Sequence, residues 1–326
     1  MNETAALLFP TGGYLWPGMG ADLPGSAQES LLERAERALA TCGVERGALG
    51  RLMAGEGQAR RLRSGEGWVW EGDFPLSMSA QTLLGIALGF ELIRVHGFPR
   101  AVAGESMGEI PATCVGQAMD VEAAVVLTYR WAEGFRAASN TLGLRMAVVE
   151  DLDEAELEAI AEVLEARVVV VDARRLLVVA VPMRYLARLE EAVGRLGGVV
   201  HVSNNHCAAH DARLREAPDA WYEYDSLLDT IGLRSAAIPI LSSLNPGEQL
   251  VTPDDLRANR RASTFTRLRW NEAIRTLPHL GIRRLIVLGS PSSAYPLRKL
   301  RSEEPELHGT SIQVVGTLAG VASLSG

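Results

Sequence analysis

Lysine is almost absent from this sequence: Lys299 is the only one among 32 basic residues, and the other 31 are arginines. The net charge of −8 argues against a broad nucleic-acid-binding surface. Cysteine is also scarce, and Cys42, Cys114 and Cys207 show no paired spacing, which argues against a disulfide framework and against a zinc site. No apolar run reaches the roughly 18 residues that a membrane span needs, and the N-terminus lacks the basic start of a secretory signal. We therefore expect a cytoplasmic protein that binds no metal, nucleic acid or membrane.

The 326 residues, of which 47% are hydrophobic and 22% charged, suffice for one large domain or for a large domain carrying a smaller one. A short apolar run at 5–9 ends at a proline and a glycine-rich turn, which is typical of a buried strand before a functional loop. Strands that alternate with helices predict an α/β fold with a mostly parallel sheet covered on both faces. The further strands are expected at 101–103, 238–241, 285–288 and 312–315, and helices at 26–53, 79–97, 107–116, from 120 past 130, and at 270–277.

Residues 144–204 follow a different pattern, in which β-branched strands and short helices take the order β-α-β-β-α-β. This order is that of the split βαβ, or ferredoxin-like, unit. We therefore predict a ferredoxin-like subdomain at 144–204, inserted into a large domain made of 1–143 and 205–326. Its strands are expected at 146–149, 168–171, 176–181 and 199–202, and its helices at 153–164 and 185–196.

A serine flanked by small residues stands between an expected strand and an expected helix. Gly104-Glu105-Ser106-Met107-Gly108 fits the pattern Gly-x-Ser-x-Gly of a nucleophile elbow, whose tight turn leaves no room for large flanking side chains. The helix N-terminus that follows favours negative charge developing at this point. Ser106 is therefore predicted to be a nucleophile.

A serine nucleophile needs a base, and the sequence offers six histidines. His206 and His210 come just after the last strand of the subdomain, whereas the others fall within or beside ordinary elements. Position alone does not select one of them.

Five segments, in order along the chain, resemble those of malonyl-transacylase-type acyltransferases of fatty-acid and polyketide synthesis. Residues 9–20 (Phe-Pro-Thr-Gly-Gly-Tyr-Leu-Trp-Pro-Gly-Met-Gly) are similar to the family's opening motif, and 104–109 to its Gly-His-Ser-x-Gly-Glu. Residues 203–208 resemble the segment with the catalytic histidine, which selects His206, and 238–248 and 268–273 resemble two later motifs.

The resemblance implies an α/β-hydrolase-like large domain, a ferredoxin-like small subdomain and an active site in the cleft between them. It implies that Ser106 forms an acyl ester with His206 as base, and that the phosphopantetheine thiol of an acyl carrier protein takes the acyl group. Coenzyme A or another carrier protein would supply the acyl group, and the resemblance implies no bound cofactor. The backbone N–H groups of Gly12 and Met107 would hold the oxyanion, and a carbonyl near the start of 242–244 would orient the histidine.

Departures from the family pattern make the acyl group uncertain. Glu105 replaces the usual histidine before the nucleophile, and Asn204 and Asn205 stand in a segment that matches neither the malonyl nor the methylmalonyl pattern. With a one-residue gap, Arg130 falls on the arginine that pairs with the malonyl carboxylate, and without the gap Trp131 takes that place. A second arrangement pairs Arg130 with Glu105 and leaves the pocket to a neutral or amine-bearing acyl group.

We therefore expect a discrete, trans-acting acyltransferase of a polyketide or macrolactam type of antibiotic pathway, with an aminoacyl or peptidyl group among its candidate substrates. A malonyl-CoA:carrier protein transacylase, a thioester hydrolase and an inactive scaffold are the alternatives. The basic residues Arg298, Lys299 and Arg301 are the predicted docking site for an acidic carrier protein.

Overall fold

The computed structural model describes residues 4–13, 20–23, 26, 28–56, 59–61, 68–70, 73–202 and 207–324. A six-stranded sheet forms the centre of the large domain, in the order β10-β9-β4-β1-β11-β12. All its neighbours are parallel except the edge pair β10–β9. The strands are β1 (Ala5–Phe9), β4 (Ala101–Gly104), β9 (Ile240–Leu241), β10 (Gln249–Leu250), β11 (Arg284–Leu288) and β12 (Ser311–Val315).

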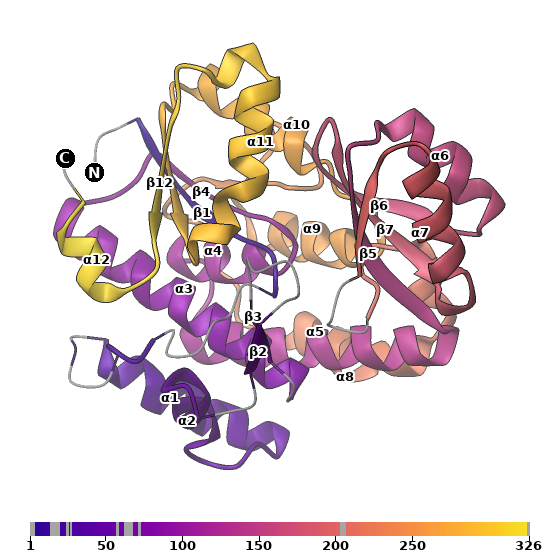
Figure 1. The fold of residues 1–326 in the computed structure, drawn as a ribbon. Helices are drawn as coiled ribbons and strands as arrows, with labels where there is room; N and C mark the ends of the chain where they lie inside the picture. The colour runs from indigo at the N-terminus through magenta and orange to yellow at the C-terminus, as the bar shows by residue number, and fades with distance from the viewer. Residues whose placement is uncertain are drawn as a thin grey trace.

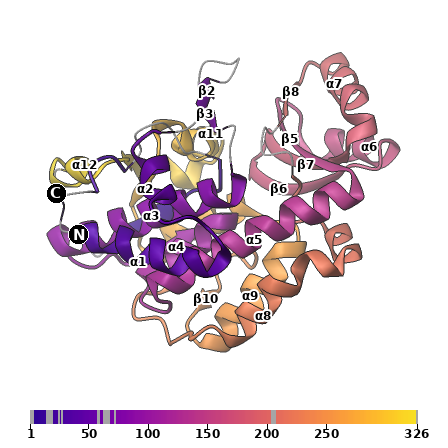
Figure 2. The same cartoon turned by 90° about the horizontal axis from the view of Figure 1, so that it is seen from below.

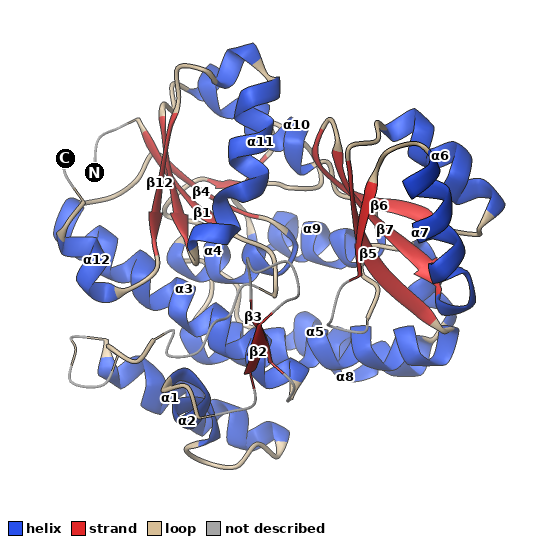
Figure 3. Ribbon diagram, in the orientation of Figure 1, coloured by secondary structure: helices blue, strands red, loops and turns tan. Residues whose placement is uncertain are grey.

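The central strands are hydrophobic on both faces because helices cover both (Figures 1 and 3). All five residues of β1 are buried, and its registers pair Leu7 with Ile286 of β11 and with Val102 of β4. The helices of the large domain are α1 (Glu29–Leu39), α2 (Ala48–Met53), α3 (Phe74–His96), α4 (Glu109–Val115), α5 (Val121–Leu142), α8 (Tyr222–Thr230), α9 (Pro253–Phe265), α10 (Trp270–Thr276), α11 (Tyr295–Glu303) and α12 (Leu318–Ala322). A two-stranded ribbon, β2 (Ala59–Arg61) and β3 (Trp68–Trp70), precedes α3.

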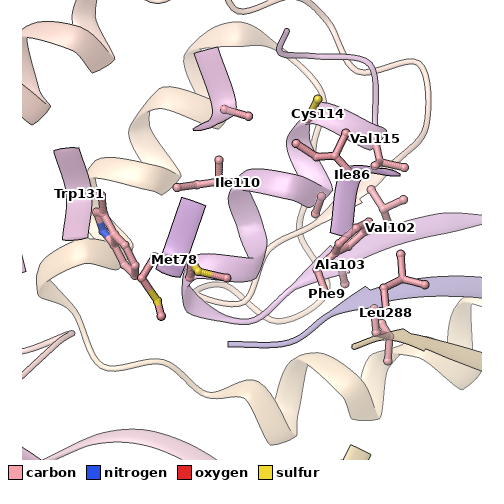
Figure 4. Close-up of a cluster of buried hydrophobic side chains, with 14 of the residues drawn as sticks. Phe9, Met78, Ile86, Val102, Ala103, Ile110, Cys114, Val115, Trp131 and Leu288 are labelled. Atoms are coloured by element: carbon pink, nitrogen blue, oxygen red, sulfur yellow. The ribbon is translucent and has the colours of Figure 1, made fainter. Parts of the chain in front are cut away.

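Helix α3 is long and apolar enough to cross a membrane by length and composition alone. However, 83% of its most apolar window is buried inside the protein, and the helix begins at Asp73, whose side chain accepts a hydrogen bond from the Leu76 amide. We therefore describe α3 as a core helix. It packs under the large sheet, where Met78 and Ile86 join Phe9, Val102 and other side chains in one hydrophobic cluster (Figure 4).

The small subdomain is an antiparallel four-stranded sheet in the order β6-β7-β5-β8, with two helices on one face (Figure 2). This strand order confirms the predicted ferredoxin-like unit. Helix α6 begins with a capping box in which Asp153 and Glu156 bond each other's backbone amides. The elements are β5 (Leu144–Glu150), α6 (Glu154–Val163), β6 (Arg167–Ala173), β7 (Leu176–Pro182), α7 (Leu186–Arg195) and β8 (Val199–Val202).

Strand β6 joins the small subdomain to the large domain. Leu268 donates its N–H to the Val169 carbonyl at 2.9 Å and accepts from the Val171 N–H at 3.0 Å, so it extends the edge of β6 by one bridge. A few residues before Leu268 is the end of α9. The active-site side of the large domain is therefore tied by backbone hydrogen bonds to the strand that faces it.

Candidate active site

Ser106 stands at a sharp turn between β4 and α4, as predicted for a nucleophile elbow. Its φ of 57° lies in the left-handed region, which is strained for a residue with a side chain. The flanking glycines are required by close packing: a Cβ on Gly104 would lie 2.0 Å from the Gly108 carbonyl oxygen, and one on Gly108 would lie 2.1 Å from that of Phe9. The short 3₁₀ turn Ser106–Gly108 then leads directly into α4.

The hydroxyl of Ser106 is hydrogen-bonded to a histidine that is held by a backbone carbonyl. Ser106 Oγ lies 2.6 Å from His210 Nε2, and His210 Nδ1 lies 2.5 Å from the Ser263 carbonyl oxygen. Because a carbonyl can only accept, Nδ1 carries the proton and Nε2 is free to accept the serine proton. Ser263 is in the last turn of α9, where a helix leaves its carbonyls without intrahelical partners. The geometry is that of an activated serine.

Two sequence-based assignments are corrected by this geometry. The histidine against Ser106 is His210 and not His206, which lies outside the described residues. The orienting carbonyl belongs to Ser263 and not to 242–244. His210 lies four residues after His206, so the resemblance located the segment but did not distinguish its two histidines. The Ser263 carbonyl could not be predicted from the sequence, because every residue has a backbone carbonyl.

The base is buried in an apolar and aromatic environment. Burial lowers the pKa of His210 to about 4, a shift that the Ser263 carbonyl opposes and to which Arg260 adds. The ring centroids of Trp131 and Phe135 lie 6.5 and 6.1 Å from that of His210. His210 is therefore neutral at pH 7, which is the form that can accept a proton.

A buried carboxylate, Glu109, connects the elbow to α9. It accepts hydrogen bonds from four side chains, and one of them, Arg260, also donates to the Ser106 carbonyl at 2.8 Å. Since α9 also supplies the carbonyl that orients His210, this network fixes nucleophile and base relative to each other. The four donors to Glu109 are Ser243 Oγ (2.7 Å), Asn259 Nδ2 (3.0 Å), Arg260 Nη1 (3.1 Å) and Ser263 Oγ (3.1 Å).

The loop after β1 carries the predicted oxyanion donor Gly12. Gln81 of α3 holds this loop on both sides, because it donates to the Thr11 carbonyl at 2.7 Å and accepts from the Gly13 N–H at 3.1 Å. A Cβ at Gly12 would lie 2.5 Å from Met78 Sδ, so the thioether occupies the space beside this glycine. Met107, the second predicted donor, is buried in the turn after the nucleophile. No pattern in the sequence pointed to Gln81.

Arg130 does not form the predicted pair with Glu105. Its guanidinium lies 2.8 Å from Glu133 and 3.8 Å from Glu223, so it pairs neither with Glu105 nor with a group at Ser106. Trp131 faces the site instead, with the Arg260 guanidinium carbon 4.7 Å from its ring centroid. The side chains of successive helix residues point about 100° apart around the axis, so Arg130 and Trp131 do not both face His210. The alignment gap therefore determined which of the two residues was predicted to lie at the site.

Glu105 is buried beside the nucleophile, and the described residues provide it with no hydrogen-bond partner. Burial, together with the carboxyl of Asp172 on β6, raises the pKa of Glu105 well above its usual value. Asn204 and Asn205, which were predicted to contact substrate, lie outside the described residues. Within the described residues, no group of three or more His, Cys, Asp or Glu side chains is arranged to hold a metal.

The three basic residues of the predicted docking site differ in their surroundings on α11. Lys299 lies 3.4 Å from both Glu150 and Asp151 of the small subdomain. Arg301 donates to the Thr310 carbonyl at 3.2 Å. Arg298 is exposed. Lys299 therefore links the two parts of the protein, and Arg298 is the member best placed to meet another molecule.

The fold and the site together describe an α/β protein with a serine–histidine pair on a nucleophile elbow and a ferredoxin-like subdomain facing it. Solved structures of this architecture include malonyl transacylases. The chain matches the malonyl CoA-acyl carrier protein transacylase of Coxiella burnetii with a TM-score of 0.81 and 18% identity, covering 98% of this chain and 96% of that one. For the corresponding enzyme of Mycobacterium tuberculosis the values are 0.79 and 20%, covering 98% of each chain.

A third match is a malonyl transacylase in complex with a type II polyketide acyl-carrier protein, with a TM-score of 0.79 and 18% identity over 98% of each chain. No protein-family model matches the sequence, and no curated protein does so significantly. At these identities the structural likeness shows a shared fold.

Proposed function

We propose that the protein is an acyltransferase that moves an acyl group from a thioester to the thiol of an acyl carrier protein through an ester on Ser106. The observation that carries this proposal is the chain of contacts from Ser106 Oγ to His210 Nε2 and from His210 Nδ1 to the Ser263 carbonyl. The architecture shared with malonyl transacylases, one of them in complex with a carrier protein, supports the same class of reaction.

In the first step Ser106 Oγ attacks the thioester carbonyl carbon while His210 takes the hydroxyl proton. The backbone N–H groups of Gly12 and Met107 stabilise the oxyanion that forms. When the carbon–sulfur bond breaks, His210 returns the proton to the leaving thiolate. In the second step the carrier thiol attacks the ester, its proton passes to His210, and the serine oxygen receives that proton as it leaves.

Ser106 is buried, so an acyl-serine ester would be protected from water until the carrier arm enters. This burial favours transfer to a thiol over hydrolysis. The arm would be the phosphopantetheine of the carrier or of coenzyme A, and no bound cofactor is needed. We place the enzyme in the cytoplasm, as a partner of acyl carrier proteins in a polyketide or macrolactam type of pathway, with Arg298 as part of its docking surface.

A malonyl group is a poor fit for this site. Arg130 is paired away from Ser106, and the buried Arg260 is bonded to Glu109 and to the Ser106 carbonyl. A second carboxylate would also lie near the acidic Glu105. The acyl group that we propose is therefore one without a free carboxylate, such as an aminoacyl or peptidyl group.

The proposal is tested by measuring the intact mass of the protein after incubation with a panel of acyl thioesters, with Ser106→Ala as the control. We expect a mass increase equal to one acyl group in the wild type and none in the variant, and loss of that mass when a carrier protein with a free phosphopantetheine thiol is added. A mass increase of equal rate in Ser106→Ala would contradict the proposal. Loss of the acyl group to water at the same rate with and without carrier would assign the site to a hydrolase.

A further inference from the structure

Two acidic side chains that lie far apart in the sequence are both buried and interact electrostatically. Glu105 immediately precedes Ser106 on the elbow of the large domain, and Asp172 belongs to β6 of the small subdomain. The two carboxyls interact electrostatically. Nothing in the reaction proposed above uses either of them, because His210 supplies the base and backbone amides would hold the oxyanion.

The position of Asp172 is fixed by an irregularity in β6. Val171 pairs with Leu177 and Ala173 pairs with Leu176, so Asp172 is the unpaired residue of a β-bulge between them. Bulges beside active sites redirect a side chain without ending the strand. The hydrogen bonds that Leu268 forms with Val169 and Val171 anchor this stretch to the large domain just after the end of α9. The bulge therefore presents Asp172 from a rigid position.

Within the part of the chain that the structure describes, neither carboxyl has the partners that a buried acid normally has. Asp172 is 6% exposed and Glu105 is 5% exposed. The Asp172 Oδ1 atom is buried without any hydrogen-bond partner, and among the described residues no arginine, lysine or histidine forms an ion pair with either side chain. By contrast Glu109, equally buried and four residues after Glu105, has four donors. An unpaired buried carboxylate is costly, which indicates a place for a cationic group from outside the chain.

We propose that Glu105 and Asp172 form a subsite for the ammonium group of an amine-bearing acyl thioester, which rests on the acyl transfer to Ser106 proposed above. A primary ammonium offers three donors and one positive charge to the two carboxyls, and it supplies the missing partner of Asp172 Oδ1. Because Glu105 directly precedes the nucleophile, the amine lies within a few bonds of the acyl carbon. The subsite gives this chain a preference for a positively charged acyl group, whereas a malonyl group is negatively charged.

The electrostatics of the empty subsite agree with this assignment. Burial raises the pKa of Asp172 to about 7, and burial and Asp172 together raise that of Glu105. The pair therefore binds protons more tightly than exposed carboxyls do, because burial and mutual repulsion both disfavour the charged forms. An ammonium group removes that repulsion, whereas a neutral acyl group of the same size does not.

The test compares pairs of pantetheine thioesters that differ only in replacing an ammonium with a methyl group. The pairs are 3-aminopropanoyl with butanoyl and 2-aminopropanoyl with 2-methylpropanoyl, and intact mass gives the rate of loading on Ser106. We expect the wild type to load the amine-bearing member of at least one pair faster by about tenfold or more, as the loss of a charge-assisted hydrogen bond predicts. Equal loading rates for the two members of each pair would contradict the proposed subsite.

Variants then assign the preference to the two carboxyls. Glu105→Gln and Asp172→Asn should each reduce, by about tenfold, the ratio of the loading rate of the preferred amine to that of its methyl counterpart. Glu190→Gln, which removes an exposed carboxylate of α7, is the control and should change neither rate. Unchanged preference in both site variants would overturn the inference. If wild type loads no thioester at all, the proposed function itself is contradicted and the subsite falls with it.

Discussion

Replacing Arg260 by methionine tests whether the Glu109 network holds the catalytic geometry. The substitution removes the donor to the Ser106 carbonyl (2.8 Å) and the ion pair with Glu109 (3.1 Å), and it leaves Glu109 buried without its counter-charge. Removal of one partner of a buried pair costs about 3–5 kcal/mol. Since Glu109 keeps three neutral donors, we expect the free energy of unfolding to fall by an amount near the lower end of this range, about 3 kcal/mol.

The assay is urea unfolding followed by tryptophan fluorescence, with the loss read from the shift of the midpoint at constant slope. The neighbouring Arg261, whose ion pairs with Asp225 and Asp229 are half exposed, provides the control, and Arg261→Met should cost less than about 1 kcal/mol. Adding Glu109→Gln to Arg260→Met should recover about 1 kcal/mol, because the uncompensated charge is gone. Equal losses for Arg260→Met and Arg261→Met would refute this account of the network.

Three further results are expected. The rate of self-acylation by a neutral thioester should stay near its maximum as the pH falls from 7 to about 5, because the pKa of His210, about 4, keeps its ring neutral; a rate that halves near pH 6.5 would contradict this. Gly108→Ala should destabilise the protein by more than about 3 kcal/mol or prevent folding, since its Cβ would meet a backbone oxygen, whereas Gly194→Ala, with open space around it, should be neutral or stabilising in thermal unfolding. Arg298→Glu should slow transfer to an acidic carrier in a salt-dependent way and spare self-acylation, and equal loss of both steps would count against docking there.

Local patterns in the sequence were sufficient to predict the elbow and the small subdomain. Small residues around Ser106, between an apolar strand and a helix, specify a turn that only glycines at 104 and 108 permit. The order of elements from 144 to 202 specifies the ferredoxin-like unit, because each strand and helix is short and strongly patterned. Both features depend on residues that are close together in the chain.

The parts of the site that depend on distant residues were not predictable in the same way. His206 and His210 stand four residues apart in one segment, and only the position of α9, whose Ser263 carbonyl bonds Nδ1, distinguishes them. The choice between Arg130 and Trp131 depended on a single alignment gap. The electrostatic interaction of Asp172 with Glu105 joins a bulge in β6 to the elbow of the large domain, and no spacing in the sequence predicts it.

The identity of the base is the central claim, and the rate of Ser106 acylation in two matched variants tests it most directly. His210→Ala and His206→Ala would each be mixed with the thioester that loads the wild type fastest, and intact mass would be followed over time. We predict that His210→Ala slows acylation by a factor of at least about 100, as loss of a general base does, while His206→Ala stays within about tenfold of the wild type. Slow acylation in His206→Ala together with a normal rate in His210→Ala would contradict the account.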